Sequence, residues 1–110
     1  MSQINGTQAD KPLDLITIGR ASVDLYGQQI GTRLEDVASF AKSVGGCPTN
    51  ISVGTARLGL KSALLTRVGK EQMGRFIREQ LAREGVETAG IGTDPERLTA
   101  LAILSVESDH

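Results

Sequence analysis

The chain has 110 residues, of which 39% are hydrophobic and 23% are charged, and its formal net charge is −1. A chain of this length corresponds to about one domain, and this composition is that of an ordinary soluble globular protein. A near-neutral charge without a basic run, together with 3% aromatic residues, argues against nucleic-acid and membrane partners.

The first segment, residues 1–12, is polar and lacks the apolar stretch of a signal peptide. We expect it to be a disordered leader, with the folded part over residues 13–110. The run Leu13–Ile18 predicts a buried strand that ends at Gly19. Glycine breaks and a looser pattern follow, and they predict short strands and turns around Gln28–Ile30 and Ser39–Val44.

Two helices with a strand between them are predicted next. Pro48 suits the first position of a helix that runs to Leu58, because its missing N–H would be unpaired there anyway. Ser62–Val68 predicts a second buried strand. The segment Gln72–Arg83 predicts an amphipathic helix, since its apolar residues fall on one face: Met73, Phe76, Ile77 and Leu81.

Gly85 is predicted to end this helix in a left-handed cap, with Val86 folding back toward the helix. Two extended segments follow near Val86–Ile91 and Leu98–Val106, with Asp94-Pro95 as the turn between them. The alternation of strands and helices predicts an α/β fold with a partly parallel sheet. The interposed short strands predict a small second sheet that no helix covers.

Familiar nucleotide-binding and catalytic patterns are interrupted or missing. The run Gly54–Ser62 nearly spells a phosphate-binding loop, but Leu60 separates its glycine from its lysine, and the run lies at the end of a helix. No G-x-G-x-x-G run occurs. The only histidine is His110, so we expect no metal cluster and no Cys–His pair. The single Cys47 fits a small packing residue in a reducing compartment, and a cytoplasmic location is expected.

The segment Gly45–Asn50 is the first candidate binding site. Its paired glycines let the backbone approach a ligand without a Cβ in the way, and the helix that follows directs free N–H groups to the same place. Asn50 offers one acceptor and two donors, which suits a vicinal diol. From spacing alone, a glycine turn that feeds a capped helix is an equally good interpretation.

Asp24 is the second candidate, in a predicted loop beyond the carboxyl end of the first strand. Ligands of open α/β sheets collect at such ends, and a carboxylate there can accept hydrogen bonds from two sugar hydroxyls. The alternative is a solvated loop aspartate. Arg20, in the same loop, can pair with an anionic substrate group or be an ordinary loop arginine.

Taken in order, these motifs resemble the N-terminal signature of the ribokinase-like (PfkB) carbohydrate kinases, from about Leu13 to about Val106. The resemblance rests on a strand ending in glycine, the following aspartate, Gly-Gly-x-x-x-Asn opening a helix, then Ala-Arg-Leu-Gly, Arg-Val-Gly and Met-Gly. Within this family, Gly19–Gly27 and Gly45–Ile51 look most like the 5-dehydro-2-deoxygluconokinases of inositol catabolism.

The resemblance implies a fold and a set of pocket residues. The fold would be the N-terminal part of a three-layer α/β/α domain with a small β-sheet lid, formed by the four short extended segments named above. Such lids often form the dimer interface, so a homodimer through the lid is expected. The residue matching Asp24 binds substrate hydroxyls in the family, and those matching Gly45, Gly46 and Asn50 line the same pocket. We add Arg20 and Cys47 as substrate-binding candidates.

The resemblance also implies an activity. The intact enzyme would transfer the γ-phosphoryl of ATP, carried with Mg²⁺, to a hydroxyl of a sugar or sugar acid, with 5-dehydro-2-deoxygluconate as the expected substrate. The family's Gly-Ala-Gly-Asp-type run, which carries the base and the anion hole, does not occur here. No catalytic residue is therefore expected in these 110 residues, and alone they should be inactive.

Two alternatives stay open: a non-catalytic sugar- or nucleoside-binding module, and an α/β fragment without a ligand. One position departs from the family. Where the family tends to have Asp after Val-Gly, this chain has Lys70-Glu71, whose acid is expected to cap the following helix.

Overall fold

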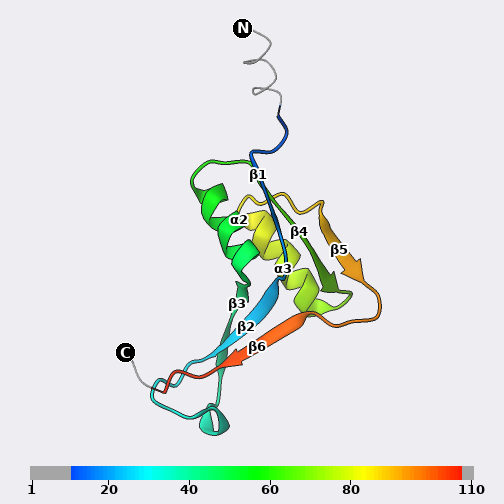
Figure 1. The fold of residues 1–110 in the computed structure, drawn as a ribbon. Helices are drawn as coiled ribbons and strands as arrows, with labels where there is room; N and C mark the ends of the chain where they lie inside the picture. Colours follow the sequence, from blue (N-terminus) through cyan, green and yellow to red (C-terminus); the bar gives the residue numbers. More distant parts are fainter. Residues whose placement is uncertain (1–10, 108–110) are drawn as a thin grey trace, which may run out of the picture.

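The computed structural model describes residues 11–107, most of which form two small sheets and two helices (Figure 1). The main sheet is parallel, in the order β1 (Leu15–Ile18), β4 (Ser62–Gly69), β5 (Ile91–Asp94). The second has the order β3 (Phe40–Gly45), β2 (Ser22–Gly27), β6 (Ala100–Leu104). The helices are α2 (Cys47–Arg57) and α3 (Gln72–Arg83), with a short 3-10 turn at Leu34–Asp36. The leader expected over residues 1–12 lies almost entirely outside the described residues.

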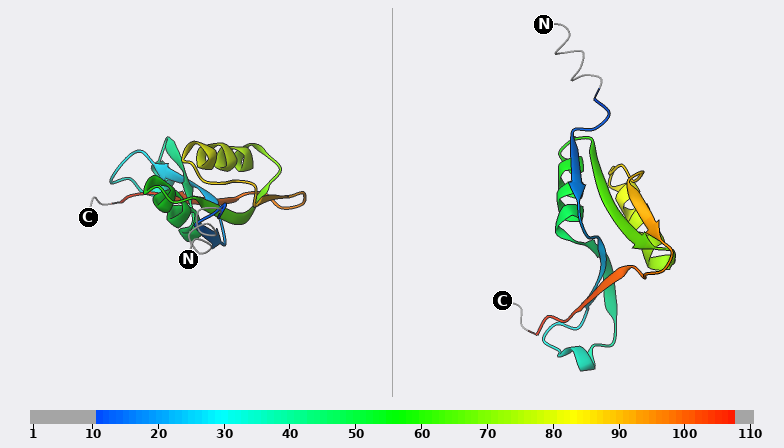
Figure 2. Two further views of the ribbon diagram at one scale, coloured as in Figure 1. Left: turned by 90° about the horizontal axis from the view of Figure 1, so that it is seen from above. Right: turned by 45° about the vertical axis from the view of Figure 1, so that its right-hand side comes forward.

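Both helices lie on the same face of the main sheet, because Thr17 of β1 bonds α2 and its register partner, Leu64 of β4, packs on α3. Figure 1 shows α2 beside β1, and the left view of Figure 2 shows α3 above the strands. The chain crosses from β1 through α2 to β4 and from β4 through α3 to β5, in one direction along the sheet. Right-handed crossovers then place both helices on one side. Thr17 faces them and donates to the carbonyl oxygen of Pro48 at 2.9 Å. The other face carries Ile16, Ile18 and Leu65, all exposed.

The hydrophobic core lies between the main sheet and the helices. Leu64 of β4 packs in one buried cluster with Ile77 and Leu81 of α3, and all three are fully buried. Met73 and Phe76 pack against the same cluster, so the apolar stripe predicted for this helix is confirmed. Each fully buried aliphatic side chain stabilises the fold by about 1.5–3 kcal/mol, and this stripe is what holds α3 on the sheet.

Both ends of α3 are capped as the sequence predicts. Glu71 precedes the helix, and its carboxylate accepts from the backbone N–H of Gly74 at 2.7 Å. Gly85 has a φ of 85°, and the N–H of Val86 returns to the carbonyl of Leu81 at 3.0 Å. Val86 is buried, so the chain leaves the helix directly into the core.

The second sheet, which we call the lid sheet, extends away from the main sheet as a thin ribbon (Figure 2, right). Strand β2 pairs antiparallel with β3 and parallel with β6. The root of this ribbon is anchored in the core, because Val23 is fully buried and Val44 packs against the same cluster. Its far end reaches beyond both helices (Figure 1), as expected for a sheet that helices do not cover.

Of the four segments assigned to the lid, β3 and β6 are confirmed, Gln28–Ile30 lies at the lid but as a turn, and Val86–Ile91 was placed wrongly. Gln28–Ile30 is a turn that follows the strand β2, and Gln29 closes it by accepting from the N–H of Ala38 at 2.9 Å. The segment Val86–Ile91 does not enter the lid, because its two apolar ends are buried in the core and Ile91 begins β5 of the main sheet.

Candidate functional site

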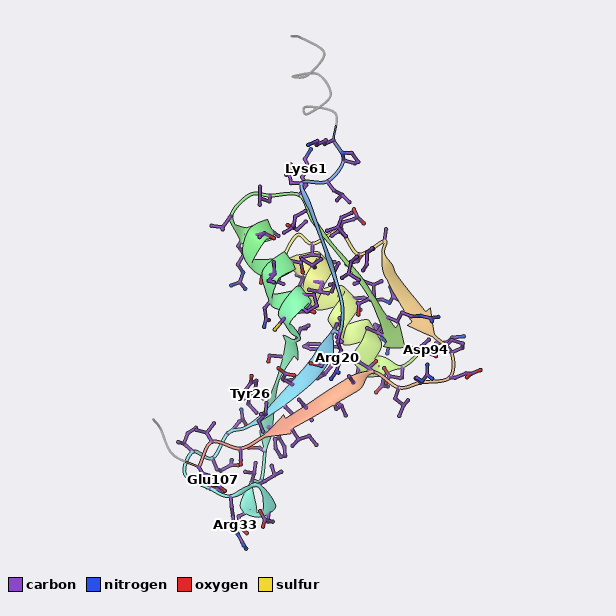
Figure 3. All side chains as sticks on the ribbon, in the orientation of Figure 1. Arg20, Tyr26, Arg33, Lys61, Asp94 and Glu107 are labelled. Carbon is purple, nitrogen blue, oxygen red and sulfur yellow. The ribbon has the colours of Figure 1, made fainter. Side chains whose placement is uncertain are left out.

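The candidate site lies where the lid sheet meets the main sheet. Figure 3 shows Arg20 at this junction, in the short link between β1 and β2. Asp24 is the third residue of β2 and lies inside the lid sheet, so the loop position predicted for it is wrong. The sequence held a signal for this strand: polar Ser22 and Asp24 alternate with apolar Val23 and Leu25, the period of a half-buried strand.

The half-buried Asp24 carboxylate lies between the Ser22 hydroxyl and the Cα of Gly45, a position that we call its seat. The hydroxyl of Ser22 donates to its Oδ1 at 2.9 Å, from the same face of β2. On the neighbouring strand, the Cα of Gly45 lies directly beneath the carboxylate, and a Cβ added there would come within 2.6 Å of Oδ1. A side chain at position 45 would therefore displace the acid from this position, and glycine leaves room for it.

Gly46 is required for a different reason. Its φ is 104°, a conformation that side chains other than glycine rarely adopt, and a Cβ would collide with the carbonyl oxygen of Arg20. Its own carbonyl accepts from the N–H of Asn50 at 2.9 Å and so starts α2. The glycine pair therefore brings the carboxylate of Asp24 close to the N-terminus of α2. Gly45 lies against the carboxylate, and the helix begins two residues later at Cys47.

Asn50 and Cys47 lie in the first turn of α2 and are exposed. Asn50 lines a groove of about 360 Å³ between α2 and α3, together with Ser43 of β3. Ser43 is the cross-strand partner of Asp24, so their side chains share one face of the lid sheet. The structure brings Asp24, Gly45, Gly46 and the backbone of Arg20 together. Asn50 faces the groove between the helices, and Cys47 is exposed at the first position of α2.

Strand β6 adds two residues that sequence reasoning missed. The register places Ala100 beside Ser22 and Ala102 beside Asp24. Their small side chains leave the carboxylate open on that side, which suits a site for a polar ligand. The sequence signal for these residues is the pattern Ala-x-Ala in β6. It indicates small side chains beside Asp24 only once β6 is known to pair with β2.

The arrangement can bind hydroxyl groups but carries no complete catalytic or metal centre among the described residues. No group of three or more His, Cys, Asp or Glu within residues 11–107 could hold a metal ion. A single seated carboxylate suits hydrogen bonds to a polyol, because these bonds are charge-assisted. Neither helix described here is long and apolar enough to span a membrane.

Comparison with known proteins places this chain in a family. Residues 13–110 match the family described as pfkB family carbohydrate kinase. The 5-dehydro-2-deoxygluconokinases of Geobacillus thermodenitrificans and Listeria monocytogenes are 42% and 38% identical to the chain over 99 and 101 residues. These matches cover 89% and 91% of this chain but only 29% and 31% of those enzymes, so the chain spans less than a third of their length.

Solved structures show the same fold. A sugar kinase from Pyrococcus horikoshii in complex with ATP superposes with a TM-score of 0.82 at 35% identity, over 88% of this chain and 32% of that one. A fructokinase from Halothermothrix orenii superposes with a TM-score of 0.78 at 33% identity, over 84% of this chain and 34% of that one. The two sheets and two helices therefore have the arrangement found in known sugar kinases.

Proposed function

The chain belongs to the pfkB family of carbohydrate kinases, and from this we propose that it forms the sugar-binding and lid portion of an ATP-dependent sugar kinase. The observation that carries the proposal is the seat of Asp24, whose carboxylate is held by Ser22 against the Cα of Gly45 at the root of the lid sheet. A carboxylate fixed in advance can accept hydrogen bonds from sugar hydroxyls without first rearranging.

We propose 5-dehydro-2-deoxygluconate as the sugar substrate. Support comes from the relatives named 5-dehydro-2-deoxygluconokinase, which are up to 42% identical in sequence to this chain over most of its length. The fructokinase is 33% identical. A sugar acid also carries a carboxylate that neutral sugars lack. Arg20, at the junction of the two sheets, is a candidate partner for that charge (Figure 3).

ATP with Mg²⁺ is the proposed phosphoryl donor, which the ATP complex of the Pyrococcus horikoshii sugar kinase supports. This chain does not supply the residues of a nucleotide and metal site. It has no Gly-Ala-Gly-Asp-type run, and residues 11–107 contain no cluster of three or more metal-binding side chains. We propose that the base, the anion hole and the nucleotide site belong to the part of such kinases that this chain does not cover, since the chain spans less than a third of the matched relatives.

The described portion contributes positioning. Asp24 and Asn50 would orient the sugar hydroxyls, and the lid sheet would cover them and exclude water. The face of the lid sheet opposite Asp24 carries Leu101 and Ile103, each about half exposed. We propose that a second copy of the protein covers this face in a homodimer, and that the enzyme works in the cytoplasm.

The test is a phosphotransfer assay on a complete enzyme that contains this chain. We expect kcat/KM to be higher with 5-dehydro-2-deoxygluconate than with fructose or ribose, and we expect the isolated 110 residues to turn over no ATP. Sugar binding without phosphotransfer by the complete protein would favour the non-catalytic sugar-binding module. Equal rates with all three sugars would contradict the proposed substrate.

A further inference from the structure

The lid sheet is joined to the main sheet by three connections. Two of them, the β1–β2 link and the glycine pair before α2, lie against each other, because the Cα of Gly46 packs on the carbonyl of Arg20. The third runs from β5 to β6 through residues 95–99 and approaches the end of β4 and the start of α3. Side chains fasten this third connection.

Glu71 and Thr99 form the fastening, which we call the Glu71–Thr99 latch. The Thr99 hydroxyl donates to Oε1 of Glu71 at 2.6 Å, and the Thr99 N–H donates to Oε2 at 3.2 Å. The same hydroxyl accepts from the N–H of Gly69 at 3.0 Å. The Glu71 carboxylate thus ties the entrance of β6 to the start of α3, which it also caps through Gly74, and the Thr99 hydroxyl ties the same entrance to the end of β4.

The Thr99 side of the latch is tightly enclosed, while Glu71 is half-buried. Thr99 is only 7% exposed, and a Cβ on Gly69 would lie 2.7 Å from the Thr99 nitrogen and 2.8 Å from the carbonyl oxygen of Arg97. A Cβ on Gly74 would collide with the carbonyl of Gly69. The hydrogen bond from Thr99 and then that from Gly74 lower the pKa of Glu71, so its carboxylate is ionised at neutral pH.

A helix cap alone does not account for this geometry. Capping uses a single oxygen of Glu71 toward Gly74, whereas two further bonds go to Thr99, a residue of the lid connection. Thr99 immediately precedes Ala100, which pairs with Ser22, and Ala102 pairs with Asp24. Thr99 of the latch therefore directly precedes β6 and lies three residues before Ala102, which flanks the carboxylate of Asp24.

We propose that Glu71 and Thr99 are positioning residues, which hold β6 and thereby the Asp24 strand in the orientation that binds the sugar. This inference rests on the proposed function for its kinetic consequence, although the latch itself is a property of the fold. Neither residue touches the sugar in this proposal. Their effect passes through the pairing of β6 with β2.

The experiment compares Thr99→Val, which keeps the shape and removes the hydroxyl, with Thr99→Ser, which keeps the hydroxyl. Glu71→Gln is the second variant, since it keeps an acceptor for the cap but turns an amide donor toward Thr99. Glu87→Gln is the matched control, because Glu87 also bonds a backbone N–H, that of Ala89 at 3.1 Å, away from the lid. The readouts in the complete enzyme are KM for sugar, KM for ATP, and amide hydrogen exchange of β6 without ligand.

We expect Thr99→Val and Glu71→Gln to raise the sugar KM about tenfold and to speed exchange in β6 by a similar factor. The ATP KM should be unchanged, and Thr99→Ser and Glu87→Gln should behave as the parent. Unchanged β6 exchange in Glu71→Gln would overturn the latch, whether or not Thr99→Val folds. Faster exchange with an unchanged sugar KM would overturn the positioning role. If the parent enzyme phosphorylates no sugar, the proposed function fails, while the exchange data still decide the latch.

Discussion

Replacing Gly45 with alanine should damage sugar binding while leaving the fold intact. The new Cβ would lie 2.5 Å from Cγ and 2.6 Å from Oδ1 of Asp24, whereas ordinary contacts begin near 3.4 Å. The carboxylate must therefore retreat by ~1 Å to reach a normal van der Waals separation. That movement would also break its 2.9 Å hydrogen bond from Ser22.

The size of the effect follows from this displacement. A misplacement of about 1 Å at a reacting or binding group can cost about a hundredfold in rate, so we expect kcat/KM for the sugar to fall about a hundredfold. The backbone should accept the change, because Gly45 is not among the glycines with positive φ. Alanine in a strand is better than glycine by roughly 0.5–1 kcal/mol, so the melting temperature should not fall.

Steady-state kinetics with varied sugar and varied ATP, alongside thermal unfolding, would measure both effects in the complete enzyme. Gly54→Ala is the matched control, since a Cβ at Gly54 in α2 meets nothing within 4 Å. It should stabilise the helix by about 0.5–1 kcal/mol and leave the kinetics unchanged. A Gly45→Ala enzyme with the parent kcat/KM for sugar would refute the idea that the seat of Asp24 serves substrate binding.

Three further predictions follow from the same geometry. Asp24→Asn should raise the sugar KM by about one to three orders of magnitude and leave the ATP KM unchanged, with a weaker effect of the same sign for Asn50→Ala; varied-substrate kinetics measure both. The Thr99 hydroxyl and then backbone donors lower the pKa of Glu71, and backbone donors lower the pKa of Asp94. Their contribution to stability is therefore present above the ordinary carboxyl pKa and is lost as the pH falls from there through the lowered pKa. Urea unfolding between about pH 7 and pH 3 should show this loss, and a flat profile would contradict it. Leu81→Ala, at a fully buried position, should lower the free energy of unfolding by about 2–5 kcal/mol in the same assay.

The two helices and the strands β1 and β4 of the main sheet were predictable because each depends on local signals. The stripe of α3 and the glycine that ends it follow from the spacing of apolar residues and from backbone geometry, which operate within one or two turns. The glycine pair was likewise recognisable as a binding motif. Spacing alone did not decide whether the glycine pair binds a ligand or only forms the turn before α2.

The errors arose where the structure depends on distant partners. Asp24 was expected in a loop, since β2 gains its pairing from β3 and from β6 at the other end of the chain. Ile91 was given to the lid because an extended segment does not reveal which sheet receives it. The latch was invisible for the same reason: Glu71 was correctly expected to cap α3, but its second partner, Thr99, lies far along the sequence.

The pairing of β2 with β6 has a consequence for how the chain folds. Ser22 pairs with Ala100, so this contact spans most of the sequence, whereas β2 is joined to β3 by residues 28–39 alone. Closing the longer loop costs more entropy before any contact compensates for it, and such non-local parallel pairing is slow. The hairpin and the α3 contacts can therefore form early, and the third lid strand is added last. The pocket that β6 flanks is, on this account, among the final parts of the molecule to acquire its native shape.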